Sequence, residues 1–218
     1  MDRKAIEKIL STERIAPYLK RQENDFEKAI LHYKANIEIS EAFYPLISIF
    51  EIGLRNNINE QLIRQFDSVD WFEDHEFVKI TSSFQVTRIT EARSSILREK
   101  KEITPGRVVS ELAFGFWTSL FDLKFEKSLW KNLRHAFPNF PKNQRQRKNI
   151  SSKLNGIRKL RNRIFHHESI AWNTEAIENY INELIEGINW LNKDLENWAV
   201  DLFRVGEVIE KERYIIER

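Results

Sequence analysis

"FYPLISIFEIGLRNNINEQLI", residues 43–63, carries apolar side chains at a helical interval. Every fourth position within it is large and apolar: Leu46, Phe50, Leu54, Ile58 and Leu62. This spacing lines the side chains along one face of an α-helix and predicts a stripe that faces the core. Pro45 predicts a break or kink in a helix that would otherwise run over residues 24–66.

The rest of the chain also has helical patterning. The 218 residues include only six glycines and five prolines, which favours long helices over a strand-rich fold. No segment alternates in the manner of a strand, so we expect an all-α fold. A short helix is expected at residues 11–20, and longer ones at 75–101, 107–133, 150–167 and 174–200. Four aromatic residues of the range 107–133 are expected in the core: Phe114, Phe116, Trp117 and Phe121.

The length suits a single domain over residues 1–218, with "PNFPKNQRQRKN" at 138–149 as the one linker and sub-boundary. The chain has no cysteine, which excludes disulfides, thiolate zinc sites and cysteine nucleophiles. No run approaches the roughly 18 apolar residues that a membrane span needs, and the N-terminus lacks an apolar signal core. We expect a cytoplasmic protein that does not enter a membrane.

Charge is strongly segregated along the chain although the net charge is only +2. Residues 127–167 contain twelve Lys or Arg and no Asp or Glu, whereas residues 168–218 contain twelve acids and five bases. An acid-free basic block of this length predicts a polyanion partner, above all a nucleic acid. The alternative is a basic surface that pairs with the acidic tail inside the same fold.

"LRNRIFHH", residues 160–167, lies at the end of this block. Arg161 follows Leu154 by seven residues and so falls on the apolar stripe of its helix, where it needs an anion, an acid or a cleft. Asn162 and His166 are four apart and share a face, but Arg161 and His166 lie roughly 140° apart around an ideal helix. Two copies of the helix, or a frayed end near His166, would let arginine and histidine converge.

These residue types suit metal-free cleavage of RNA. Histidine transfers protons near neutral pH, and arginine stabilises charge that develops on a phosphate. The attacking group would be the ribose 2′-hydroxyl, which DNA lacks. The alternative is an ordinary basic helix C-terminus, where positive charge is favoured. Since His166 and His167 diverge on a helix, and His32, His75 and His135 show no ligand spacing, we expect no metal and no cofactor.

Three stretches together resemble the Abi-like (abortive infection) family of HEPN-fold proteins over most of the chain. "RNRIFHH" fits the signature Arg-Asn-x-x-x-His, and "LRNRIFHHESIAWN" (160–173) is similar to its extended form. "LISIFEIGLRNNI" (46–58) and "TPGRVVSELAFGFWTSLF" (104–121) resemble further family blocks in the expected order.

The resemblance implies a HEPN-like helical bundle with additional N-terminal helices, forming a homodimer in which two signature helices face each other. It implies an RNase used in phage defence or as a toxin, with a separate antitoxin or non-coding RNA as a further partner. Arg161 and His166 would be the catalytic pair, Asn162 their orienting partner and His167 a helper.

Supporting roles are expected for Glu51, Arg55 and Asn56. Glu51 and Arg55 either support Arg161 from a neighbouring helix or form an ion pair within their own helix. RNA contacts are expected from seven basic residues: Arg107, Lys142, Arg145, Arg147, Lys148, Arg158 and Arg163. Arg107 could instead cap its own helix, and residues 142–148 could be a solvated loop. The competing functions are a non-catalytic RNA-binding module and a helical module that binds a protein through the amphipathic stretch 174–198.

Overall fold

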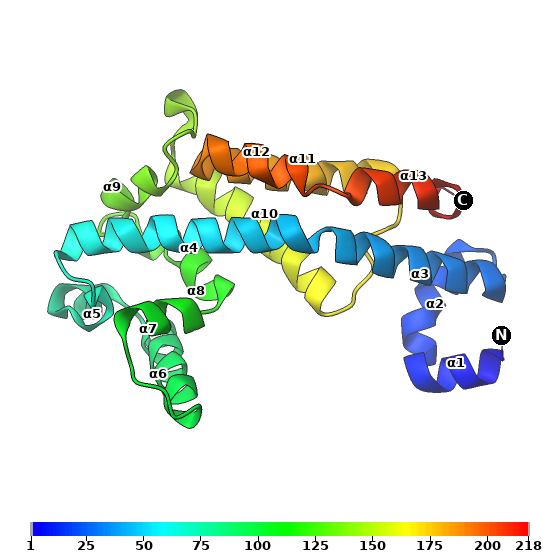
Figure 1. Cartoon of the computed structure of the whole chain (residues 1–218), viewed down its shortest axis with the longest axis horizontal. Helices are drawn as coiled ribbons and strands as arrows, with labels where there is room; N and C mark the ends of the chain where they lie inside the picture. The colour runs from blue at the N-terminus through cyan, green and yellow to red at the C-terminus, as the bar shows by residue number, and fades with distance from the viewer. Residues whose placement is uncertain (1, 218) are drawn as a thin grey trace.

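Two helices placed end to end form the axis of the molecule: α3 (Phe26–Ala42) and α4 (Tyr44–Phe66) (Figure 1). Phe43 alone separates them and keeps a helical backbone, so its N–H still donates to the carbonyl of Ile39 at 3.2 Å. Pro45 lies in the first turn of α4, where its missing N–H costs nothing. The expected break near Pro45 is therefore confirmed.

The remaining helices lie around this axis in the computed structural model, which describes residues 2–217. Helix α10 (Arg147–Phe165) runs obliquely across the α3–α4 axis, and α11 (Thr174–Leu191), α12 (Lys193–Asp201) and α13 (Val205–Ile216) lie along one side of it (Figure 1). The opposite side carries α5 (His75–Ile80), α6 (Ser83–Arg98), α7 (Pro105–Glu111) and α8 (Phe114–Ser119). Helices α1 (Arg3–Leu10) and α2 (Thr12–Arg21) lie near the end where both termini are found.

Short helical turns complete the chain: η1 (Trp71–Glu73), η2 (Leu123–Phe125), α9 (Trp130–Leu133), η3 (Arg134–Ala136) and η4 (Lys142–Gln144). All regular structure in residues 2–217 is thus helical, which confirms the all-α prediction. Within that same range no helix is both long enough and apolar enough to span a membrane.

The core forms where α4, α8, α10 and α11 meet. The predicted stripe of α4 is buried at every position, and so are the four aromatic residues expected in the core. At the centre of this packing, Gly187 of α11 lets the chain approach Phe50 of α4 and Ile157 of α10: a Cβ at Gly187 would lie 2.9 Å and 3.0 Å from their side chains. The close crossing of these three helices holds α10 against α4.

Three of the predicted long helices are interrupted. The helix expected at 75–101 breaks at Thr81 and Ser82, where Ser82 and Gln85 form a capping box that starts α6. The helix expected at 107–133 breaks at Leu112 and Ala113, which are extended, and continues as short pieces. The helix expected at 174–200 breaks at Asn192.

Asn192 is extended, and its side chain accepts the N–H of Leu195 at 2.9 Å, so it ends α11 and caps α12. The break changes the direction of the chain. Trp198, which continued the predicted apolar stripe, is consequently 54% exposed.

The segment 138–149 is fixed to the bundle. Phe140 is buried and packs edge-on against Trp190 of α11, with ring centroids 4.2 Å apart. Residues on both sides of the segment, such as Phe137 and Ile150, belong to the same hydrophobic core. The basic segment therefore joins parts that pack together.

Candidate functional site

Helix α10 ends at the paired histidines. His166 is the C-cap residue, and His167 has a left-handed backbone with φ 58°. The N–H of His167 donates to the carbonyl of Ile164 at 3.0 Å, and that of Glu168 to the carbonyl of Arg163 at 2.8 Å. These two bonds form a Schellman motif, which usually has glycine at the left-handed position because a side chain there costs about 1–2 kcal/mol. The helix is thus closed by hydrogen bonds at His166, in place of the fraying considered above.

Arg161 meets an acid, as its position on the apolar stripe requires. Its Nε donates to Oε1 of Glu51 on α4 at 2.8 Å, and the two side chains are 30% and 27% exposed. The guanidinium also lies over the ring of Phe165, 4.3 Å from the centroid. Among the described residues, nothing accepts a hydrogen bond from Nη1 or Nη2 of Arg161. The side chain is therefore held from two directions while its outer nitrogens stay available to an anion.

Glu51 adopts the first of its two expected arrangements, since it pairs with Arg161 across helices. The Nε of Arg55 donates instead to Oδ1 of the adjacent Asn56 at 3.3 Å. Glu51, Arg55 and Arg161 line a cavity of about 190 Å³, together with Ser110 and Glu111 at the end of α7. The two arginines of this cavity are balanced by two glutamates.

Asn162 and His166 lie apart from this cavity. Both side chains are exposed, and no hydrogen bond or ion pair within residues 2–217 joins either of them to Arg161. Asn162 lines a broad open depression with Arg158, Lys159 and Arg163. A single chain therefore presents the three signature side chains without assembling them into one hydrogen-bonded cluster.

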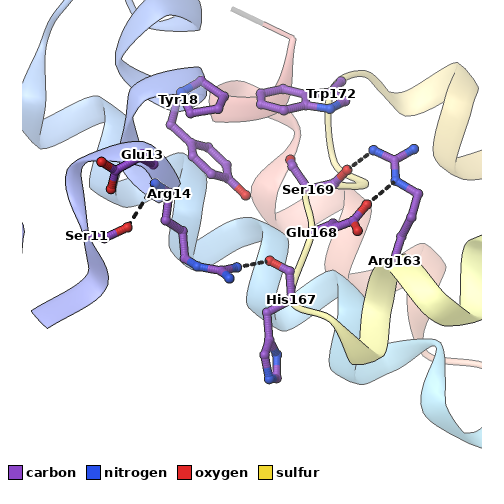
Figure 2. A pocket seen from close by; sticks show the side chains of 10 residues that line it. Ser11, Glu13, Arg14, Tyr18, Arg163, His167, Glu168, Ser169 and Trp172 are labelled. Carbon is purple, nitrogen blue, oxygen red and sulfur yellow. Dashed lines mark hydrogen bonds and ion pairs between the residues drawn. The ribbon is translucent and has the colours of Figure 1, made fainter.

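The segment that follows α10 is held by arginines (Figure 2). Arg14 of α2 donates to the carbonyl of His167, and Arg163 donates to the carbonyl of Ser169 and to the hydroxyl of Tyr180, the latter at 3.1 Å. Figure 2 also shows the imidazole of His167 pointing away from Tyr18 and Trp172. Arg163, an expected RNA contact, thus serves to fix the backbone beside the histidines.

Two buried polar residues of α3 hold the same segment and were not identified from the sequence as site residues. The Oδ1 atom of Asn36 accepts the N–H groups of Ile170 and Ala171 at 2.8 Å and 3.2 Å. Nε2 of His32 lies 2.6 Å from the carbonyl oxygen of Ala171 and must donate to it, since a carbonyl oxygen only accepts. The sequence did carry a signal, because His32 and Asn36 are four apart on a helix face that also bears Ala29 and Ile39.

His32 is a neutral structural histidine. Its Nδ1 lies 3.1 Å from Nε2 of Gln22, which donates to it, so both ring nitrogens are satisfied. The side chain is completely buried. This burial lowers the pKa of His32 below its usual 6.5, the nearby charge of Arg21 adds to the shift, and the bond to Ala171 opposes it.

The predicted RNA-contacting residues fall into two groups. In the first, arginines hold backbone carbonyls: Arg145 donates to Pro138 and Phe140 at 2.9 Å and 2.7 Å, Arg147 to Phe121 at 2.7 Å, and Arg107 to Glu102 at 2.7 Å. For Arg107, this bond is local but does not cap its helix, since Glu102 precedes α7 and Thr104 is the N-cap.

The second group faces solvent. The side chains of Lys142 and Lys148 are exposed and have no hydrogen-bond or ion-pair partner among residues 2–217. The side chain of Arg158 donates only to Asn155, three residues earlier, at 2.9 Å. The site region thus offers one braced arginine with free outer nitrogens, exposed histidines at a closed helix end, and unpaired lysines at and before the start of the same helix. Comparisons of the chain with protein-family models, with curated proteins and with solved structures found no match.

Proposed function

We propose that this chain is a metal-independent endoribonuclease of the HEPN type that acts in the cytoplasm, in abortive-infection phage defence or as a toxin. The observation that carries the proposal is Arg161, braced by Glu51 and Phe165 with its outer nitrogens free, five residues before an exposed histidine. The acid-free block of residues 127–167 around it supplies a positive surface for RNA. The resemblance of three sequence stretches to the Abi-like family points to the same chemistry.

In the proposed reaction, the 2′-oxygen of a ribose attacks the adjacent phosphorus, a P–O2′ bond forms and the P–O5′ bond breaks. One histidine accepts the proton of the 2′-hydroxyl, and another delivers a proton to the departing 5′-oxygen. Arg161 stabilises the extra negative charge of the pentacoordinate phosphorus. The products are a 2′,3′-cyclic phosphate and a 5′-hydroxyl.

The proposed active site is composite. His166 lies five residues after Arg161, and no hydrogen bond or ion pair joins the two inside one chain, so a second copy would supply the facing signature helix. Two copies would provide both the acidic and the basic histidine from the same residue, His166. Asn162 would orient these groups, and His167, whose ring turns outward, would assist them.

Cleavage of labelled RNA in EDTA tests the proposal. We expect the wild type to cut and to leave cyclic-phosphate ends, and His166→Ala and Arg161→Ala to lose at least about 100-fold in rate with unchanged circular dichroism. His75→Ala is the matched control, since it removes an exposed histidine far from the signature and should cut as the wild type does. Equal cleavage by folded His166→Ala would contradict the proposal.

A non-catalytic RNA-binding module is the second candidate. It is favoured by the separation of Arg161 from Asn162 and His166 in one chain, and by the unpaired Lys142 and Lys148. This function predicts RNA binding that weakens steeply with salt while the RNA stays intact for the wild type and for His166→Ala alike.

A further inference from the structure

A second, less polar depression lies between α3 and the end of α10. It has a volume of about 500 Å³, within the range of ligand-binding clefts. Its walls include Ile37, Tyr44 and Phe165, which are 51%, 58% and 42% exposed, and His167 stands at its edge. Three large apolar side chains that stay this open around one groove indicate a surface that another molecule covers. We name this depression the α3–α10 groove.

The aromatic walls of the α3–α10 groove are connected to Arg161. The rings of Tyr44 and Phe165 contact each other, with centroids 6.4 Å apart and planes tilted by 53°. The same Phe165 ring lies under the guanidinium of Arg161. A ligand in the groove would therefore contact the same Phe165 ring that the Arg161 guanidinium covers.

The groove also carries unpaired polar groups. Asn36 is only 3% exposed, and the two backbone N–H groups that its Oδ1 accepts fix which end of its amide is the oxygen. Its NH₂ group donates to nothing among the described residues, and Asn36 is one of the residues that line the groove. Ser40 and Glu41, which line the groove beside it, likewise have no side-chain hydrogen bond or ion pair within residues 2–217. The residues that line the groove thus include an amide donor, a hydroxyl and a carboxylate beside the aromatic rings.

We propose that the α3–α10 groove binds one nucleobase of the RNA whose phosphate is held by Arg161. The base stacks on Tyr44 and lies beside Phe165, while its edge meets the Asn36 amide and the Glu41 carboxylate. A nucleobase matches the groove because it is flat, uncharged and rimmed by both donors and acceptors, and its own phosphate lies within one nucleotide of it. The inference rests on the proposed function, since it takes RNA as the substrate.

The test measures RNA affinity in a His166→Ala background, so that the RNA is not cut. One abasic nucleotide is moved position by position through a short RNA, and each RNA is titrated with protein carrying Tyr44, Tyr44→Ala or Tyr44→Phe. We expect Tyr44→Ala to weaken binding of the intact RNA about 5- to 100-fold, and Tyr44→Phe to bind as tightly as Tyr44. At one position, removal of the base should weaken binding to the protein that carries Tyr44. For that abasic RNA, Tyr44→Ala should cause no further loss of affinity, because the ring no longer has a base to contact.

Trp198→Ala is the control, because Trp198 is also an exposed aromatic residue but does not line the groove. A Tyr44→Ala effect of equal size on every abasic RNA would overturn the base-binding proposal, since the ring would then not contact a base. Unchanged RNA affinity of Tyr44→Ala would also overturn the base-binding proposal. The nuclease proposal would still stand in that case if His166→Ala abolishes cleavage. Failure of the intact protein to bind any RNA would overturn both.

Discussion

His32 shows how one buried side chain ties three parts of the chain together. It links α3 to the backbone of Ala171 and, through Gln22, to the end of α2. Both bonds need the neutral ring with its proton on Nε2, since Nδ1 accepts from Gln22. The local structure after the signature therefore depends on the protonation state of His32.

We predict that the free energy of unfolding falls as the pH drops below 6.5 because of His32. Its folded pKa lies below the unfolded value of 6.5, so the unfolded chain takes up a proton that the folded chain resists. The contribution of His32 to the free energy of unfolding is complete above pH 6.5. It decreases below that pH by at most about 1.4 kcal/mol per pH unit, until the pH reaches the lowered pKa of the folded state. Urea unfolding followed by circular dichroism measures this loss, and His32→Gln, although less stable, should lack it. A pH-independent wild type would contradict the prediction.

His167 is informative because of its left-handed backbone. A left-handed residue other than glycine is strained, and such residues concentrate at functional sites. We predict that His167→Gly unfolds with a free energy about 1 kcal/mol higher than His167→Ala, because only glycine adopts this backbone without strain.

The same pair of variants separates the backbone of His167 from its side chain. If the imidazole assists cleavage, both variants should cut RNA more slowly than the wild type by a similar factor, in spite of their different stabilities. Rates that follow stability would assign His167 a structural role only.

The residue patterns predicted some of this site and missed the rest. The position of Arg161 on an apolar stripe predicted that it must meet an anion, an acid or a cleft, and it pairs with the acid Glu51. The closure of the helix at His167 was not predictable, since the sequence has histidine where that turn normally has glycine. His32 and Asn36 were missed because their partners are backbone groups that lie more than a hundred residues away in the chain.

At the scale of helices, a single small residue controls how the elements of the site pack. Gly187 places α11 against both α4, which carries Glu51, and α10, which carries Arg161. The salt bridge between those two residues needs this close packing. The crossing is thus the structural support of the candidate site.

We predict that Gly187→Ala lowers the free energy of unfolding by about 1–3 kcal/mol, because the new methyl group would overlap Phe50 and Ile157. Gly106→Ala is the matched control. A Cβ at Gly106 in α7 meets nothing within 4 Å, and alanine is the better helix former, so this variant should be at least as stable as the wild type. Urea titration of both variants measures the difference, and equal stability would mean that α11 shifts without cost.

The spacing of apolar residues predicted which segments are helical, but it did not predict where several of the helices end. The stripe of α4 is buried as predicted, because burial of a four-residue repeat requires one continuous helix. Ser82 and Asn192 lie inside predicted helices, although Ser82 has the capping-box spacing to Gln85 in the sequence. Each acts instead as the cap of a new helix, a role that depends on where the bundle forces the chain to turn.

For the whole molecule, the basic block of residues 127–167 has two different uses. Arg145, Arg147 and Arg163 hold backbone carbonyls that keep loops in place, and their charge is partly met by nearby acids such as Glu126 and Glu168. Lys142 and Lys148 remain exposed and unpaired within residues 2–217. The count of basic residues alone therefore overstates the surface that is free to bind a polyanion.

This division predicts opposite effects for neighbouring residues on RNA affinity and on stability. Replacing both Lys142 and Lys148 by alanine, in the His166→Ala background, should reduce the slope of log affinity against log salt by up to about 1.4, since each lost phosphate contact on a single strand contributes about 0.7. The free energy of unfolding should not change. Arg147→Ala should lower it by about 1–3 kcal/mol, because the side chain is only 13% exposed and its loss leaves the Phe121 carbonyl without a donor.

Salt titrations of RNA binding and urea unfolding of both variants measure the two quantities on the same samples. If Arg147→Ala retains full stability and changes the salt slope as the lysine pair does, the arginines bind RNA and the division is wrong. If the lysine pair leaves the slope unchanged, RNA does not follow α10 toward its N-terminus. The proposed substrate path would then be confined to the C-terminal end of α10, around Arg161 and the α3–α10 groove.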